Sequence, residues 1–262
     1  AIVPAEWVVG DGLDTGGGPH ILQTRDGVIW MTSFHGLKGV NRFDGKAWTH
    51  FRLSDLGGDN QNSSVLETKD GTLWVGGYGR LHAYRNGIWK VYKAPDAPIP
   101  ANHISGLWEA SDGALYVAGW GQEAVRLDYG TARWTTYEGL NFQCETSDGA
   151  QWFLSQDNRV VRYDGRTWTR YGVKDGLMDT PVALLVTRQG GLWAAGSHDS
   201  TAATARFDGQ RWSLQTHSHL SWGIDRRAVY ESSDGALWFG AAGIWFPERG
   251  HLGGVLRFDG KT

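Results

Sequence analysis

The sequence predicts an all-β fold, because one turn-and-strand motif recurs along the whole chain. An acidic residue and Gly form a turn, and an aromatic residue follows four positions after the first turn residue, as in Asp234-Gly235-Ala236-Leu237-Trp238. In the fifth copy Gln189 replaces the acidic residue. The aromatic residues of the six copies are Trp30, Trp74, Tyr116, Trp152, Trp193 and Trp238. They lie 36 to 45 residues apart, and such a period, running from end to end, is typical of a repeat architecture.

A second turn follows the first within the repeats and predicts the rest of each unit. Asp44-Gly45, Asn86-Gly87 and Asp164-Gly165 each precede a Trp by a few residues. Asp-Gly and Asn-Gly between apolar runs are strong hairpin signals, since Gly and Asn tolerate the positive φ of a tight turn. Each repeat therefore reads as four short strands, which in the second repeat are residues 64–67, 72–76, 80–84 and 88–92. Four antiparallel strands per repeat of about 42 residues indicate a six-bladed β-propeller that occupies residues 1–262 as a single domain.

The two ends of the sequence predict how this ring closes. Residues 257–262 stop where a fourth strand with its Trp is expected, and residues 5–9 form such a strand with no blade before it. Trp7 and Trp48 are 41 residues apart, the same spacing as Trp48 and Trp89. We therefore expect the N-terminal strand to complete the last blade, so that neither end leaves a bare sheet edge.

Composition narrows the classes of partner. The 25 basic and 28 acidic residues give a net charge of −3, which provides no electrostatic reason to expect nucleic acid as a partner. No apolar run reaches the roughly 18 residues of a membrane helix, so we expect no membrane insertion by this chain. We expect a monomer, or one domain of a larger protein. The single Cys144 is predicted to be a buried small hydrophobe in the strand before Asp148-Gly149.

These motifs resemble the two-component regulator propeller repeat over nearly the whole chain. The resemblance is carried by Gly176-Leu177, Val229-Tyr230-Glu231, the stretch from Asp234 to Gly240, Arg206-Phe207-Asp208-Gly209 and Trp168-Thr169-Arg170-Tyr171. It implies an extracytoplasmic sensor that recognises a ligand such as an oligosaccharide, and hence a periplasmic or extracellular location. The chain also resembles, more weakly, streptogramin B lyase propellers, which use a His and a magnesium ion on one face.

The turns and the loops of such a fold have different roles. The uniform Asp-Gly turns predict a structural role for Asp26, Asp70, Asp164 and Asp234. The irregular loops at the other end of the strands, which we call the loop face, are where function is expected. The leading hypothesis is a sensor domain without catalytic residues that binds a small polar ligand, a glycan or a peptide there. Exposed aromatic rings would stack on the ligand and polar groups would orient it. The candidate ligand-binding residues are Trp120, Gln122, Trp222, Trp245, His20, His35, His103 and His219.

Two alternatives stay open. The first is a metal-assisted lyase or hydrolase, because several His fall on the loop face and imidazoles can bind a divalent metal ion or act as a base. Its candidate ligands are His198, His217, His219 and His103, of which His217 and His219 are the best local pair. The leading hypothesis requires no cofactor. The second alternative is a protein–protein interaction platform.

Overall fold

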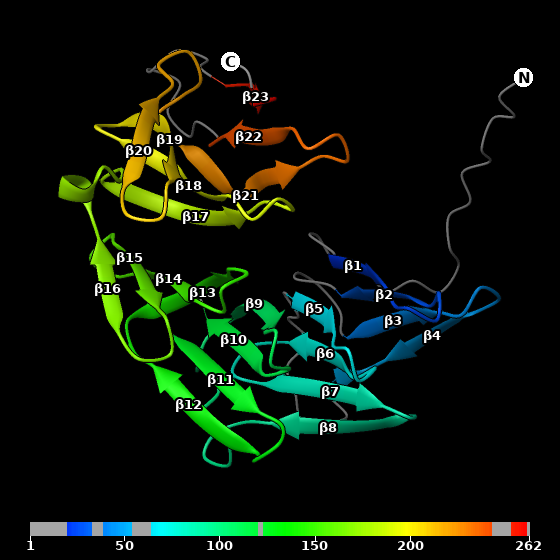
Figure 1. Ribbon diagram of the computed structural model, residues 1–262. Helices are drawn as coiled ribbons and strands as arrows, with labels where there is room; N and C mark the ends of the chain where they lie inside the picture. Colours follow the sequence, from blue (N-terminus) through cyan, green and yellow to red (C-terminus); the bar gives the residue numbers. More distant parts are fainter. Residues whose placement is uncertain (1–19, 33–38, 54–63, 120–122, 243–252, 261–262) are drawn as a thin grey trace, which may run out of the picture. The chain divides into compact units, whose positions relative to one another are not determined.

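The computed structural model describes residues 20–32, 39–53, 64–119, 123–242 and 253–260, and it is built almost entirely of β-strands (Figure 1). The strands form six antiparallel sheets. Contacts divide the chain into two compact units, Ala1–Thr136 and Tyr137–Thr262. Among the residues described, no helix is long and apolar enough to span a membrane.

The first unit contains three four-stranded sheets, in each of which the strands follow one another in sequence order. The first sheet is β1 (His20–Gln23), β2 (Ile29–Thr32), β3 (Val40–Phe43) and β4 (Trp48–Phe51). The second is β5 (Ser64–Glu67), β6 (Leu73–Gly76), β7 (Leu81–Arg85) and β8 (Ile88–Tyr92). The third is β9 (Ile104–Glu109), β10 (Leu115–Gly119), β11 (Ala124–Asp128) and β12 (Arg133–Tyr137).

The second unit contains the fourth, fifth and sixth sheets. The fourth is β13 (Leu140–Glu145), β14 (Gln151–Ser155), β15 (Val160–Tyr163) and β16 (Trp168–Tyr171), followed by the 3₁₀ turn η2 (Val173–Asp175). The fifth is β17 (Thr180–Val186), β18 (Leu192–His198), β19 (Thr201–Phe207) and β20 (Trp212–Thr216). The sixth has three described strands, β21 (Ile224–Glu231), β22 (Leu237–Ala241) and β23 (Val255–Phe258).

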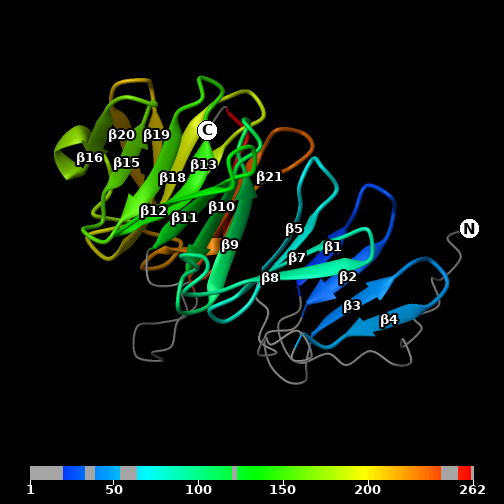
Figure 2. The ribbon, with the colours of Figure 1, turned by 90° about the horizontal axis from the view of Figure 1, so that it is seen from below.

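Neighbouring sheets within a unit pack face to face through aromatic side chains. β1 lies beside β5, as both views show (Figure 1, Figure 2), and β17 lies beside β21 (Figure 1). Between the first and second sheets, the Trp30 ring lies 5.2 Å from Tyr84. Between the fourth and fifth, the Trp152 ring lies 5.1 Å from Phe207. The repeated aromatic of the motif is therefore a buried core residue in the first four repeats, where burying rings of this size supplies much of the sheet-to-sheet adhesion, whereas Trp193 is partly buried and Trp238 is exposed.

The structure confirms the all-β, propeller-like arrangement of antiparallel sheets that the sequence predicts. The sixth sheet differs from the other five because it contains three described strands. Trp7 and the predicted closing strand lie outside the described residues, so ring closure, the count of six blades and the single domain remain predictions.

Candidate functional site

A pocket opens on the loop face of the second unit, between the end of β20 and the start of β23. Its volume is about 470 Å³. The lining residues are Gln215, Thr216, His217, Ser218, His219, Leu220, Gly253, Gly254, Val255 and Leu256. Two of the predicted site histidines, His217 and His219, therefore lie in one cavity. The mixture of hydroxyl, amide, imidazole and apolar side chains suits a small polar ligand.

Local hydrogen bonds hold the wall of this pocket in place. The backbone N–H of His217 donates to the Ala202 carbonyl at 2.7 Å, and the N–H of Leu220 donates to the His217 carbonyl at 3.0 Å. The Nε2 atom of His217 lies 2.9 Å from the hydroxyl of Thr204. Burial lowers the pKa of His217, so its imidazole is neutral at pH 7. His219 is exposed at the pocket, where its ring is open to a ligand.

The remaining predicted residues do not join this cavity. Trp222 is 46% exposed but does not line the pocket. His20 is the exposed first residue of β1. His103 forms a β-bridge with Tyr78, and their rings meet edge to face at 5.0 Å. The other four candidates lie outside the described residues: His35, Trp120, Gln122 and Trp245.

His198, a predicted metal ligand, takes part in a turn. Its Nδ1 atom accepts the backbone N–H of Asp179 at 3.3 Å, and the Asp179 carboxylate lies 3.5 Å away. That carboxylate also accepts the backbone N–H of Asp199 at 2.8 Å. These contacts fix the turn between β18 and β19. Within the described ranges, no three His, Cys, Asp or Glu side chains converge to hold a metal ion.

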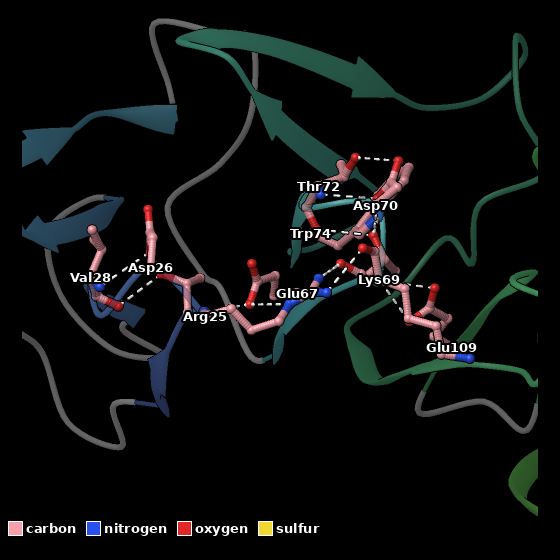
Figure 3. Close-up of polar contacts among 11 residues, drawn as sticks. Arg25, Asp26, Val28, Glu67, Lys69, Asp70, Thr72, Trp74 and Glu109 are labelled. Atoms are coloured by element: carbon pink, nitrogen blue, oxygen red, sulfur yellow. Dashed lines mark hydrogen bonds and ion pairs between the residues drawn. The ribbon is translucent and has the colours of Figure 1, made fainter.

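At the other end of the strands, the Asp-Gly turns are held together by their own side chains (Figure 3). The Thr68 hydroxyl donates to Asp70 at 2.7 Å and accepts the indole N–H of Trp74 at 3.2 Å. Asp70 in turn accepts the backbone N–H of Thr72 at 3.0 Å. The turns of Asp26, Asp148 and Asp234 repeat the bond from a hydroxyl two residues earlier. These contacts support a structural role for Asp26, Asp70 and Asp234, and Asp164 likewise accepts the two N–H groups of its own turn.

At three boundaries between neighbouring sheets, a glutamate links the turn of one sheet to a strand end of the next, a contact that we call the carboxylate bridge (Figure 3). Glu67, the last residue of β5, accepts the backbone N–H of Arg25 at 2.9 Å. Glu109, the last residue of β9, accepts the N–H of Lys69 at 2.8 and 3.0 Å. Glu231, the last residue of β21, accepts the N–H of Arg188 at 2.8 Å. Bonds of this kind, with a charged acceptor, are stronger than neutral ones.

An arginine reinforces two of the three bridges from the opposite side. The Arg25 guanidinium donates to the carbonyls of Thr68 and Lys69. The Arg188 guanidinium donates to the carbonyls of Glu231, Ser232 and Ser233. The arginine and the glutamate thus cross the sheet boundary in opposite directions, and each one satisfies backbone groups of the other sheet.

The boundary between the fourth and fifth sheets has neither half of this bridge. Ser147 stands before Asp148, where Arg25 stands before Asp26 and Arg188 precedes the fifth-sheet turn. Val186 is the last residue of β17, where β5, β9 and β21 end in glutamate. Sequence reasoning noted a Glu at the strand end but missed its role. The signal was the similar separation along the sequence between each glutamate and the residue that it bridges to, which is 42, 40 and 43 residues in the three cases.

Cys144 lies on β13 and packs against the cluster of buried side chains around Trp152. The residue as a whole is partly exposed, whereas its thiol is surrounded by apolar side chains. This burial raises the pKa of the Cys144 thiol to about 12. A thiol with so high a pKa carries almost no thiolate at neutral pH, which favours the predicted packing role over a nucleophilic one.

Comparison with known proteins gives both a repeat family and a fold. Residues 57–79 match the family described as two component regulator propeller. No curated protein matches the chain. The extracellular domain of BT3049 from B. thetaiotaomicron, described as a hybrid two component system, superposes with a TM-score of 0.67 at 15% identity. That match covers 89% of this chain and 33% of the other, so the chain spans about a third of that domain's length.

Two further solved structures share the fold. An inactive variant of virginiamycin B lyase from Staphylococcus aureus with quinupristin gives a TM-score of 0.62 at 18% identity, covering 87% of this chain and 80% of the lyase. The extracellular domain of BT4673 from B. thetaiotaomicron, described as a one component system, gives 0.61 at 16% identity, covering 92% of this chain and 35% of the other. At these identities the likeness concerns the fold. Residues 57–79 therefore match the two component regulator propeller repeat, and the chain shares its fold with these solved structures.

Proposed function

We propose that this chain is an extracytoplasmic recognition domain of the sensor type, which binds a small polar ligand, a glycan or a peptide without catalysis. The observation that carries the proposal is the loop-face pocket of about 470 Å³ that contains His217, Ser218 and His219. The family match and the extracellular domains of similar fold support the sensor role and the location.

The pocket's chemistry favours recognition over reaction. The neutral His217 lies within hydrogen-bonding distance of Thr204, and none of the described residues that line the pocket is acidic. Without a carboxylate beside it, an imidazole of lowered pKa lacks the partner that would orient it as a general base. The same groups can donate to and accept from a bound ligand, and the apolar wall of Leu220 and Leu256 can exclude water from it.

A thermal-shift screen against glycans, peptides, small metabolites and divalent ions tests this function, because a ligand that binds only the folded protein raises its melting temperature. The shift should shrink in His219→Ala. It should persist in the control Ser233→Ala, at the other end of the strands, which lines neither this pocket nor the cavity beside Ser147. A hit that is lost only in Ser233→Ala would contradict the proposed site.

The outer edge of β23, which no described strand covers, supports the proposed closure of a six-bladed ring. Val255 is 61% exposed, whereas Val40, Leu81 and Val160, at the same register positions of their sheets, are fully buried beside a fourth strand. In the first, fourth and fifth sheets a Trp pairs with the last residue of the third strand, as Trp48 does with Phe43. By this register Trp7 would pair with Phe258.

Engineered disulfides test the closure and its register. In a Cys144→Ser background, Val8→Cys should cross-link to Arg257→Cys, because directly opposed residues have Cα atoms within disulfide range. Val9→Cys with Arg257→Cys, shifted by one residue, should not. Efficient bonding in the shifted pair alone, or in neither pair, would contradict the closure. Because Val255 and Leu256 also line the loop-face pocket, ligand screens require the full chain.

A metal-assisted lyase is the second candidate. It is favoured by the match to virginiamycin B lyase, because that match includes 80% of the lyase chain. Two measurements test this candidate. One is elemental analysis of the purified protein, and the other is the lyase or hydrolase activity of a triple variant with His198→Ala, His217→Ala and His219→Ala. A metal-free protein whose ligand binding is unaffected by added magnesium would eliminate this candidate.

A further inference from the structure

The first strand of the sixth sheet, β21, carries a long bulge. Ile224 pairs with Ala241, and Val229 pairs with Phe239. β21 therefore advances five residues where β22 advances two, an excess of three residues. The first strands of the third and fifth sheets have a bulge at the same place, but each contains one extra residue. We call the extra residues of the sixth sheet, 225–227, the arginine bulge.

Close contacts fix the path of this bulge. Ala228, the residue after it, lies over Gly240 of β22, and a Cβ built on Gly240 would meet the Ala228 Cβ at 2.7 Å. Only a glycine allows this approach. At the other end, the Asp225 carboxylate accepts the backbone N–H of Arg227 at 2.8 Å. β-Bulges are often used to re-aim side chains at functional sites, so the direction of the side chains in this one is informative.

Asp225 also orients the guanidinium group of Arg227. The Nε atom of Arg227 donates to Oδ1 of Asp225 at 3.2 Å, and Nη2 donates to Oδ2 at 3.0 Å. These two bonds use one edge of the guanidinium group, and three of its five N–H groups remain. The Arg227 side chain is 82% exposed, more than any other arginine in the ion pairs of the described residues. Its outer edge, with Nη1 and Nη2, is thus held in one orientation and open to solvent.

Arg226 adds a second positive charge to the same place. This residue is exposed. The hydrogen bond from Arg227 is the main cause that lowers the pKa of Asp225, and the positive charge of Arg226 lowers it further, so both arginines lie near one carboxylate. Two arginines and one aspartate give the bulge a net charge of +1. The extra residues of the third and fifth sheets, Ser105 and Val182, are uncharged.

We propose that the arginine bulge binds an oxyanion, which is a carboxylate or a phosphate group carried by a ligand. Two oxygens of such a group match the outer edge of Arg227, because the planar guanidinium group donates two parallel hydrogen bonds. Arg226 supplies further positive charge, and Asp225 positions Arg227. This site goes beyond the recognition pocket proposed above, since none of the described residues that line that pocket belongs to the bulge.

The test is an NMR titration of the full chain that follows the Nε–H resonance of Arg227. The probes are sodium phosphate and sodium acetate, with sodium chloride at equal ionic strength as the reference. Both oxyanions should shift this resonance with dissociation constants of about 1 to 10 mM, and chloride should shift it far less. Tighter binding of phosphate would assign the ligand's group as a phosphate, and tighter binding of acetate as a carboxylate. No shift with either oxyanion, or an equal shift with chloride, would overturn the proposal.

Arg227→Lys separates a built site from simple charge attraction, because lysine keeps the charge but lacks the planar fork. Followed at the backbone N–H of Arg226, the better of the two oxyanions should bind about five-fold more weakly or worse in this variant. Arg166→Gln is the control, since it removes an exposed arginine from a turn outside the bulge and should bind as the parent does. Unchanged binding in Arg227→Lys, or an equal loss in Arg166→Gln, would overturn the proposal.

Asp225→Asn tests the positioning role of the carboxylate. The asparagine oxygen can still accept the backbone N–H of Arg227, so the bulge should keep its path, but the amide group cannot accept the bond from Nη2. Charge attraction alone predicts tighter oxyanion binding, because a negative charge is lost. We expect weaker binding, because Arg227 is no longer held. Equal or tighter binding in Asp225→Asn would contradict the role assigned to Asp225.

Discussion

The boundary between the fifth and sixth sheets and the boundary between the fourth and fifth differ in how their turn ends are joined. Both have an aromatic core, formed by Trp193 with Phe258 in the first case and by Trp152 with Phe207 in the second. Of these two boundaries, only the fifth–sixth boundary has the carboxylate bridge, from Glu231 to Arg188. Packing of apolar side chains is therefore sufficient to hold two sheets together, and the bridge is an addition that closes the turn end.

The absence of the bridge coincides with an open cleft. Where Glu231 and Arg188 are present, backbone groups of both sheets are paired across the boundary. Where Ser147 and Val186 replace such a pair, a cavity of about 390 Å³ remains. This contrast separates residues that fold the sheets from residues that seal them, and substitutions at either kind of boundary can test it.

The largest expected effect concerns a buried polar position in the first unit. His82 on β7 is fully buried, and at the same register of the fifth sheet stands Ala205. Burial lowers the pKa of His82 to about 4, from 6.5 in the unfolded chain. Since the unfolded state takes up the proton first, stability is complete above pH 6.5 and falls as the pH drops toward 4, by about 3 kcal/mol.

Equilibrium unfolding in denaturant at a series of pH values measures this loss. His82→Leu should remove most of the slope between pH 6.5 and 4, and His20 and His217, whose pKa values are also lowered by burial, should contribute to what remains. His219→Gln, at an exposed position, is the control and should keep the parent slope. An unchanged slope in His82→Leu would show that this imidazole is not the acid-sensitive group.

The next largest effect compares the Thr–Trp pair beside a carboxylate bridge with the pair beside the open cleft. Thr68→Val should destabilise the protein by about 2 kcal/mol, because it leaves the buried indole N–H of Trp74 without its acceptor. Thr146→Val should cost under about 1 kcal/mol, because water entering the cleft can accept the bond from Trp152. Urea unfolding curves measure both, and equal losses would contradict an open cleft at Thr146.

Removal of a bridge should have a moderate effect. Glu231→Ala should lower the free energy of unfolding by about 1 to 2 kcal/mol, since it removes a carboxylate that accepts the Arg188 N–H. Ser147→Ala, at the boundary without a bridge, should change stability by less than about 0.5 kcal/mol. If both variants lost the same amount, the bridge would have no special contribution.

The smallest effect is a gain. Ser147→Arg combined with Val186→Glu installs both halves of a bridge at the fourth–fifth boundary and should raise the free energy of unfolding by about 0.5 to 1 kcal/mol, the range for a partly exposed ion pair. Arg188→Lys, which keeps the charge but loses the planar fork, is the comparison at an existing bridge. A loss of stability in the double variant would indicate that Val186 contributes more by packing than glutamate does by bridging.

The sequence predicted the sheets well because their determinants are local. Asp70-Gly71 forms a turn with a positive φ at the Gly, and the aromatic four positions after Asp70 is buried Trp74, so spacing alone identified strand and core. The structural role of Asp70 was likewise expected, and its hydrogen bonds to Thr68 and Thr72 support it.

The candidate sites depended on contacts between distant residues and were harder to predict. His217 and His219 were chosen as an alternating pair, but their pocket needs Gly253–Leu256, which only folding brings near. The missing bridge between the fourth and fifth sheets could not be foreseen, because Ser147 and Val186, which stand at its two ends, are far apart in the sequence. A comparison of repeats position by position would have revealed that Val186 replaces a glutamate, although not which turn lies opposite it.

Amide hydrogen exchange at four equivalent backbone positions tests the central claim most directly. The N–H groups of Arg25, Lys69 and Arg188 donate to a bridging glutamate, whereas Ser147 stands where no glutamate is present. After correction for intrinsic rates, NMR should show that the Ser147 amide exchanges about ten-fold faster or more than the other three amides. Equal protection at Ser147 would mean that the fourth–fifth boundary is sealed and would contradict the account.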